Sequence, residues 1–315
     1  KALLNEDPSR IIANESVNTS EIQSNCNYNI KRMEGFGYIR PLLFVDNSCE
    51  SSNFNNMKGE LMGIIDTYKK SGVLTSSSVY LKEYNDNSWM SINEDEKFMP
   101  GSLLKVPELI TFLKMNELKP GTLDKELMYD HEFTVNKQPK FLSQSIQIGH
   151  KYTIRQLLTY MIAYSDNNAT MLLNANIDVA MFKKTFTDFG LAAPDWNSSN
   201  YPISAKDFSL FMRALYNACY LTKANSEFAT ELLSKCDFMN GMMKGLPENI
   251  KVAHKFGEAG NQSGLELHES GIIYLNNTAY LITIMTKGRD LNKLPDVIRE
   301  ISAKVYQNMI NRKAA

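Results

Sequence analysis

The stretch Met99-Pro100-Gly101-Ser102-Leu103-Leu104-Lys105 marks the point where a strand pattern ends and a helix pattern begins. A proline and a glycine interrupt the strand pattern, and apolar residues recur at helical spacing from Val106 onward. A helix that starts here places the Lys105 ammonium one turn from the Ser102 hydroxyl, on the same face. A serine hydroxyl is a weak nucleophile, but a lysine kept neutral by burial can take its proton. The stretch therefore carries a candidate nucleophile and its base.

A simpler interpretation makes Ser102 the N-cap of this helix. A capping box, however, expects Glu or Gln where Lys105 stands, and a lysine in the first turn opposes the helix dipole. A cap accounts for the serine but not for the lysine. Short motifs recur by chance, so both interpretations stay open on this tetrapeptide alone.

Two further motifs follow in order along the chain. Ser165-Asp166-Asn167 lies between two helical patterns, and Lys255-Phe256-Gly257 lies in a strand pattern. Each has a structural explanation, because Ser, Asp and Asn are preferred N-caps and strand lysines commonly extend to solvent. The ordered set Ser-x-x-Lys, Ser-Asp-Asn and Lys-x-Gly nevertheless resembles that of class A β-lactamases and penicillin-binding proteins. The resemblance extends over residues 57 to 312.

The resemblance implies roles for four catalytic residues. Ser102 would attack the carbonyl carbon of an amide, and Lys105 would take the proton of the attacking hydroxyl. Ser165 would relay a proton to the leaving nitrogen. Lys255 would pair with that serine and attract a substrate carboxylate.

The same resemblance implies a set of substrate-binding positions. The Asn167 side chain would face the substrate amide. Apart from the resemblance, the place of Tyr164 beside the second motif makes it a candidate for a wall of the site. Gly257 would let the strand approach a bound ligand closely. A backbone N–H near Glu258 or Ala259 would join that of the nucleophile in an oxyanion hole. Asp166 is expected to be structural.

The chain departs from the family pattern at two places. Phe256, also counted among the substrate-binding positions, stands where family members carry Thr or Ser, so a hydroxyl for the substrate carboxylate is missing. Ser263 is a candidate substitute for that hydroxyl.

The second departure concerns the loop predicted over residues 187 to 204. Class A enzymes carry there a Glu that activates the deacylating water, but here no Glu occurs between Glu132 and Glu227. The polar stand-ins are Asp195 and Asn197, and Asp is one methylene shorter than Glu. Because small misplacements strongly lower rates, efficient β-lactam hydrolysis by the usual route is not expected.

The order of patterns predicts an α/β (α+β) fold. We expect an antiparallel sheet formed by both chain ends, flanked by helices, with an inserted all-helical lobe; the resemblance implies the same. The patterns are a helix at 58–69, a hairpin within 79–92, mostly helical sequence over 102–236, strands near 250–256, 270–275 and 279–286, and a helix at 295–310.

The sequence also predicts the domain organisation. Residues 1–56 form an Asn- and Ser-rich, loosely structured extension whose apolar stretch at 38–45 docks on the main body. Residues 57–312 form the catalytic domain, which divides into a sheet lobe (57–99 and 245–312) and a helical lobe (100–244). A disulfide between Cys26 and Cys49 would tie down the extension if the protein is exported.

Composition excludes several classes of function. Lys and Arg number 34 against 35 Asp and Glu, so nucleic acid is not an expected partner. No apolar run has the length of a transmembrane helix. The cysteine spacing fits no zinc pattern, and no glycine-rich phosphate loop opens a helix, so we expect neither metal nor cofactor. The chain begins without Met, and we expect an exported, extracytoplasmic monomer from which a signal peptide has been removed.

The leading hypothesis is a class A β-lactamase-like serine hydrolase that forms an acyl-enzyme through Ser102. Its substrate would be a β-lactam or the amide of a D-alanyl, peptidoglycan-type peptide. One alternative is a penicillin-binding D-Ala-D-Ala peptidase that deacylates slowly. A non-catalytic sensor of cell-wall fragments is another, and a serine-dependent glutaminase is a more distant one.

Overall fold

A five-stranded antiparallel sheet forms the centre of the structure, in the order β4-β3-β11-β10-β9. The computed structural model describes residues 26–133, 139–198, 200–261, 264–276 and 278–314. The strands of the sheet are β3 (Leu74–Glu83), β4 (Trp89–Ile92), β9 (Lys251–Asn261), β10 (Gly264–Leu275) and β11 (Thr278–Gly288). Strands from both ends of the chain thus share one sheet, and the predicted fold class is confirmed.

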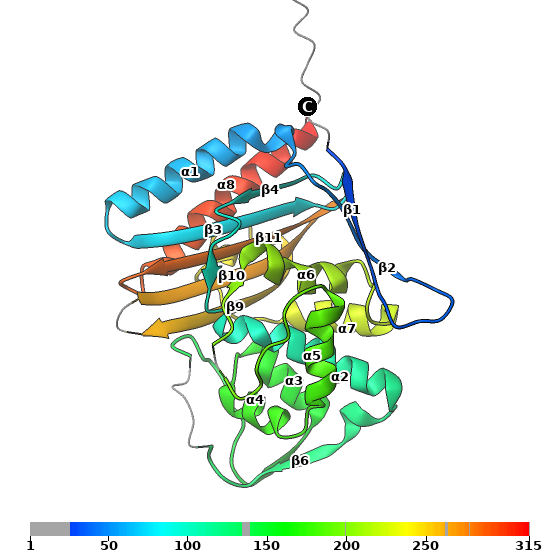
Figure 1. Ribbon diagram of the computed structural model, residues 1–315. Coiled ribbons are helices and arrows are strands. Elements are labelled where there is room, and N and C mark those ends of the chain that lie inside the picture. The colour runs from blue at the N-terminus through cyan, green and yellow to red at the C-terminus, as the bar shows by residue number, and fades with distance from the viewer. Residues whose placement is uncertain (1–25, 134–138, 199, 262–263, 277, 315) are drawn as a thin grey trace, which may run out of the picture.

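Helices cover both faces of this sheet (Figure 1). On one face lie α1 (Asn55–Lys70) and α8 (Leu294–Ala314), which contact each other. The helical lobe packs against the other face. Side chains alternate between the two layers, as the period of a strand requires. Tyr80 joins the core on the helical-lobe side, and its neighbour Val79 joins the core under α1 and α8.

Within the described residues, six α-helices make up the helical lobe. They are α2 (Lys105–Leu118), α3 (Ile154–Ala163), α4 (Asn167–Asn174), α5 (Val179–Asp188), α6 (Ala205–Tyr216) and α7 (Lys223–Leu233). Two short antiparallel pairs accompany them, β5 (Lys97–Phe98) with β8 (Ile203–Ser204) and β6 (Glu126–Tyr129) with β7 (His150–Thr153). Within the described ranges, no helix has the length and apolar character needed to cross a bilayer.

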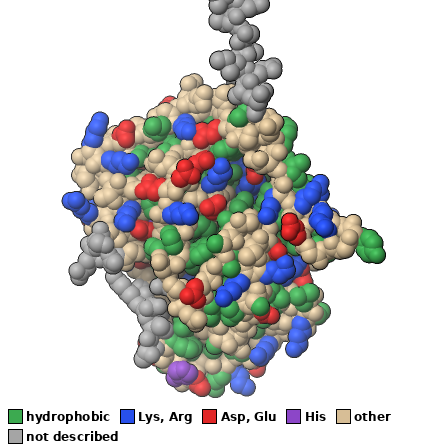
Figure 2. Space-filling model, in the orientation of Figure 1, with side chains coloured by type: hydrophobic (Ala, Val, Ile, Leu, Met, Phe, Trp, Pro, Cys, Tyr) green, Lys and Arg blue, Asp and Glu red, His purple; other side chains and the backbone are tan. Residues whose placement is uncertain are grey.

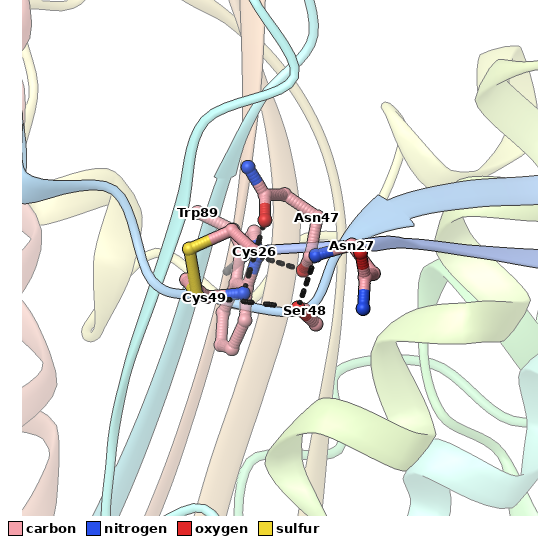
Figure 3. Close-up of a disulfide and its surroundings, with 6 residues drawn as sticks. All are labelled: Cys26, Asn27, Asn47, Ser48, Cys49 and Trp89. Carbon is pink, nitrogen blue, oxygen red and sulfur yellow. Dashed lines mark hydrogen bonds between the residues drawn. A yellow bond between two sulfur atoms is a disulfide. The ribbon is translucent and has the colours of Figure 1, made fainter. Parts of the chain in front are cut away.

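The amino-terminal segment is more ordered than its composition predicts. From Cys26 onward it forms a hairpin of β1 (Tyr28–Arg32) and β2 (Leu42–Asn47). Figure 3 shows the disulfide that joins Cys26 to Cys49 at its base, beside Trp89, whose indole N–H donates to the Asn47 carbonyl at 2.8 Å. Closing a loop of 23 residues in this way restricts the unfolded chain, which favours the folded hairpin. Residues 1–25 lie outside the described part of the chain.

Apolar and charged contacts both hold the hairpin on the body. Leu43 and Phe44 of β2 are buried in the core, whereas the connection between the strands projects outward and carries hydrophobic side chains (Figures 1 and 2). Beside them, Asp46 accepts hydrogen bonds from Lys82 at 2.9 Å and from Arg213 at 2.7 Å. Burial would raise the pKa of Asp46, but the two cations outweigh it and lower that pKa. Asp46 therefore neutralises two cations whose side chains are only 3% exposed.

Replacing this carboxylate tests how strongly the hairpin contributes to stability. Asp46→Ala should lower the free energy of unfolding by about 3 kcal/mol, because it leaves two buried cations without their partner. Chemical denaturation measures the change. The exposed Asp66 of α1 offers a matched control, and Asp66→Ala should stay within about 0.5 kcal/mol of the parent. Equal effects of the two substitutions would contradict the proposal that the contacts of Asp46 with Lys82 and Arg213 stabilise the fold.

Candidate active site

Ser102 lies in a tight turn and not at a simple helix cap. Residues Gly101–Leu104 form a short 3-10 helix, η2, which continues directly into α2. Pro100 and Leu104 occupy the two N-cap positions, and neither makes a side-chain capping bond. The capping interpretation of Ser102 is therefore wrong, and Ser102 is a half-buried residue within the short 3-10 helix.

The turn that carries Ser102 lies against the backbone of β9. A Cβ on Gly257 would fall 2.9 Å from the Leu103 nitrogen and still closer to the Pro100 carbonyl oxygen. A Cβ on Gly101, whose φ is +54°, would overlap the Glu258 carbonyl oxygen. The two glycines thus allow backbone to meet backbone. The close approach seen at Gly257 is to this turn, whereas the approach to a bound ligand stays a prediction.

The position of β9 at the edge of the sheet matters for the same reason. Only β10 pairs with it within the described sheet, so its other edge faces η2. Strand edges carry backbone N–H and C=O groups that no neighbouring strand satisfies. A row of such groups consequently lies beside Ser102.

Hydrogen bonds join three of the predicted catalytic residues. The Ser165 hydroxyl accepts from Lys255 Nζ at 2.9 Å and from Lys105 Nζ at 3.3 Å. Lys105 also donates to the Ser165 carbonyl at 2.7 Å and to Asn167 Oδ1 at 2.8 Å. The structure therefore brings Lys105, Ser165, Asn167 and Lys255 together, one turn of helix away from Ser102.

The backbone around Ser165 is specialised for this placement. Its φ is 58°, in the left-handed region, which costs a non-glycine residue about 1 kcal/mol. The next residue, Asp166, is fully buried and caps α4 by accepting the Asn168 N–H at 2.9 Å. It also accepts the Ser145 hydroxyl and the Ile146 N–H, both at 2.9 Å. These bonds fix Asp166 as a structural residue and offset the strain at Ser165.

Both lysines are buried, and burial weakens their hold on a proton. Burial, reinforced by the positive charge of Lys255, holds the pKa of Lys105 well below its usual value. Burial lowers the pKa of Lys255 to about 8, although nearby acidic groups oppose the shift. Amines of this kind can exchange protons near neutral pH, which ordinary surface lysines do not.

Phe256 does not occupy the substrate-facing position expected for it. Its side chain is fully buried and stacks on Phe238 with ring centroids 4.5 Å apart. Lys255 Nζ lies 4.1 Å from the Phe256 ring centroid and donates to the Phe256 carbonyl at 3.0 Å. The phenyl ring therefore supports Lys255 from the core side, and the prediction that it contacts substrate needs this correction. Ser263, the candidate substitute hydroxyl, lies outside the described residues.

Two other predicted substrate-binding residues, Tyr164 and Glu258, make contacts within the protein. Tyr164 is half-buried and packs edge-on against Tyr160. The Glu258 carboxylate accepts the N–H of Lys140 at 2.9 Å and of Phe141 at 3.1 Å. Glu258 thereby ties the segment after residue 138 to the strand beside Ser102.

Asp195 lies in the loop that follows α5, where it forms a hydrogen bond within its own turn. Asp195 is exposed, and its carboxylate accepts the Asn197 N–H at 3.0 Å within a turn. The loop is held by aromatic contacts, Trp196 against Phe182 and Tyr201 against Phe186. The contacts of Asp195 are therefore those of a turn residue and do not link it to the two lysines.

The sequence analysis did not identify Glu108, an ionisable residue near Lys105. Glu108 lies three residues further along α2 and is 7% exposed. The signal was a carboxylate within the apolar stretch from Val106 to Leu113, where a helix buries its face. Within the described ranges, no group of three or more His, Cys, Asp or Glu could hold a metal ion.

The close approach at β9 can be tested on its own. Gly257→Ala should lower the free energy of unfolding by about 2 kcal/mol or more, because both clashing groups are backbone and must move. Thermal or chemical unfolding measures the change. Gly59 lies on α1 with open space around it, so Gly59→Ala should raise stability by about 1 kcal/mol. An unchanged stability for Gly257→Ala would refute the contact.

Comparison with known proteins assigns this chain to a family. A model of the "Beta-lactamase enzyme family" matches residues 61–309. The β-lactamase VEB-1 of Pseudomonas aeruginosa is 24% identical over 250 residues, which are 71% of this chain and 82% of VEB-1.

Solved structures show the same fold at low sequence identity. PBP-A superposes with a TM-score of 0.69 at 19% identity, covering 82% of this chain and 97% of its own. A β-lactamase from Chitinophaga pinensis superposes with a TM-score of 0.68 at 18% identity, covering 80% of this chain and 99% of its own. Since the family model spans most of the sequence, the chain belongs to the beta-lactamase enzyme family and has the fold of class A β-lactamases and penicillin-binding proteins.

Proposed function

We propose that this protein is a serine hydrolase whose Ser102 forms an acyl-enzyme with a β-lactam or with the amide of a D-alanyl peptide. The observation that carries the proposal is the Ser165 hydroxyl held between two buried lysines, Lys105 and Lys255. Such an arrangement can pass a proton from a nucleophile to a leaving group. Relatives support the substrate class, since VEB-1 is a β-lactamase and a PBP-A mutant forms an acyl-enzyme complex with penicillin G.

Acylation then proceeds by one proton transfer from the nucleophile to Lys105 and a two-step transfer through Ser165 to the leaving nitrogen. Lys105, as the free amine, takes the proton from the Ser102 hydroxyl while the oxygen bonds to the carbonyl carbon. The tetrahedral intermediate collapses as the carbon–nitrogen bond breaks. Ser165 gives its proton to the leaving nitrogen and regains one from Lys105, which lies 3.3 Å from its hydroxyl.

Backbone groups stabilise the developing oxyanion. We place there the N–H of Ser102 and an N–H from the free edge of β9 near Glu258 or Ala259. The contacts of Gly101 with Glu258, and of Gly257 with Pro100 and Leu103, bring these two backbones close together. Donors fixed in advance stabilise the charge of a transition state without reorganisation.

Two residues orient the substrate in this account. Asn167 Oδ1 accepts from Lys105, which fixes the rotation of the side-chain amide toward a substrate amide. Lys255 is protonated below its pKa of about 8 and attracts a substrate carboxylate. Tyr164 forms a wall. The Phe256 side chain does not help to orient the substrate, because its ring is buried.

The fate of the acyl group distinguishes two versions of this function. Asp195 is exposed and engaged in its own turn, so we do not assign it the task of activating the deacylating water. This favours slow release of the acyl group, as in a penicillin-binding peptidase. The disulfide between Cys26 and Cys49 supports an extracytoplasmic site of action, because such bonds persist in oxidising compartments.

A mass time course with penicillin G tests the proposal. The intact protein should gain one penicillin adduct that persists long after excess ligand is removed. Ser102→Ala should gain none, since it lacks the nucleophile, although its thermal unfolding should be unchanged.

The other outcomes of this time course are equally decisive. An adduct that appears and clears with turnover would favour a β-lactamase over the slow version. Labelling of Ser102→Ala at the parental rate would refute Ser102 as the nucleophile. Reversible binding without any adduct would favour the sensor.

The pH dependence of acylation tests the role of Lys255. Its charge is present below its pKa, so the acylation rate constant should fall as pH rises through about 8. Lys255→Arg keeps a cation at every accessible pH and should move this fall to much higher pH, even if the maximal rate is lower. A fall near pH 8 that persists in Lys255→Arg would assign it to another group.

A further inference from the structure

Glu108 is a buried carboxylate with an incomplete set of partners. Its Oε2 atom is buried and has no hydrogen-bond partner in the described structure. The Asn174 side chain at the end of α4 forms a hydrogen bond with the Glu108 carboxyl group. The Oδ1 atom of the same Asn174 is also buried without a partner. Unsatisfied buried polar atoms are uncommon in folded proteins and call for a functional or structural reason.

The positive charge that acts on Glu108 is that of Lys105. The two residues are three apart on α2, so their side chains lie on the same helical face. Lys105 directs its hydrogen bonds to Ser165 and Asn167, so Glu108 influences the ammonium by charge and not by a direct bond. Burial raises the pKa of Glu108 to about 7, while Lys105 and Asn174 oppose the rise.

Among the described residues, Lys255, Glu108, Asp166 and Glu258 act on Lys105 by charge, and Glu108 is the carboxylate with the largest effect. Lys255 from β9 lowers the pKa of Lys105, after the larger effect of burial, whereas Glu108, Asp166 and Glu258 raise it, in that order. Asp166 is saturated by its three donors, and Glu258 holds the backbone N–H groups of the segment after residue 138. Glu108 alone of these carboxylates combines proximity on the same helix with an unpaired oxygen.

We propose that Glu108 is a positioning residue that keeps Lys105 basic enough to take the proton of Ser102. The catalytic consequence rests on the proposed acyl transfer. Burial and Lys255 both weaken Lys105 as a base, and the carboxylate of Glu108 counteracts them from within α2. When the Ser102 proton reaches Lys105 Nζ, the ionised carboxylate offsets the new positive charge. Lys105 then returns a proton to Ser165, which has given its own to the leaving nitrogen, and Glu108 forms no bond with substrate.

The proposal implies that Lys105 and Glu108 titrate as a pair. In coupled sites the observed midpoints belong to both groups together. Removing the carboxylate charge therefore lowers the proton affinity of Lys105. The acidic limb of acylation, where Lys105 must lose its proton to act, consequently moves to lower pH.

Glu108→Gln is the direct test, because it keeps the shape and the hydrogen bond but removes the charge. We expect the acidic limb of the acylation rate with penicillin G to shift down by about one pH unit, and the maximal rate to fall by about tenfold because a weaker base remains. Glu108→Asp retains the charge and should keep the limb near its parental position. Glu117 lies on the same helix and binds Thr222 and Asn225 instead, so Glu117→Gln should leave the profile unchanged.

A second measurement reads the protonation of Lys105 without any reaction. NMR of isotope-labelled lysine side chains follows the Lys105 resonance, assigned by its loss in Lys105→Arg. Its titration midpoint should move down in Glu108→Gln. If that variant does not fold, Asn174→Ala should shift the midpoint in the same direction by less, since Asn174 favours the ionised carboxyl of Glu108.

The two measurements separate failure of this inference from failure of the proposed function. Normal acylation with neither the limb nor the midpoint moved in Glu108→Gln would overturn the role of Glu108. A lower maximal rate with unmoved midpoints would do the same, because it would indicate a structural role only. Absence of acylation in the parent would refute the proposed function, and the NMR midpoint would then decide the coupling by itself.

Discussion

The approach of the Ser102 turn to the edge strand β9 is the constraint on which the rest of the site depends. Gly101 and Gly257, one on each backbone, leave no room for a Cβ between them. That contact lays the unpaired edge of the sheet beside Ser102. It also carries Lys255 of β9 to within hydrogen-bond distance of Ser165 in the helical lobe. A single packing requirement thus joins the two parts of the structure and assembles the three motifs.

Both lysines of the site are buried away from water, and oxygen atoms of the surrounding residues accept their hydrogen bonds. The Ser165 hydroxyl and carbonyl, Asn167 and the Phe256 carbonyl accept the hydrogen bonds of the two lysines. A strained backbone at Ser165, held in place by Asp166 as the N-cap of α4, orients these groups. The cost of burying amines is what makes them useful, because it brings proton exchange near neutral pH.

Long, regular patterns made most of the fold predictable from sequence. The alternation around Val79 and the apolar face of α8 each persist over several turns or pairs, so the hairpin and the last helix were expected at the observed places. The hairpin at β1 and β2 was not expected, since the bonds of Asp46 with Lys82 and Arg213, which help to hold it on the body, join distant segments. Such charges carry no periodic signal.

The site was predictable only as far as its motifs reach. The order of the motifs indicated that Ser102, Lys105, Ser165 and Lys255 belong together, and the structure places the last three in contact. Alternation along β9 could not reveal that Phe238 and Phe141 pack against the ring of Phe256, because both faces of this sheet are covered. The sequence could not single out Glu108, since one carboxylate in an apolar helix has many ordinary explanations. Its burial near Lys105 is seen only in the structure.

We propose that this assembled geometry makes Ser102 a nucleophile. Peptide mapping by tandem mass spectrometry, after incubation of the folded protein with penicillin G and an acid quench, tests it most directly. The account predicts a penicilloyl group on the peptide that contains Ser102, attached to that side chain. An adduct confined to another residue, or a folded protein in which Ser102 stays unmodified at every pH, would contradict it.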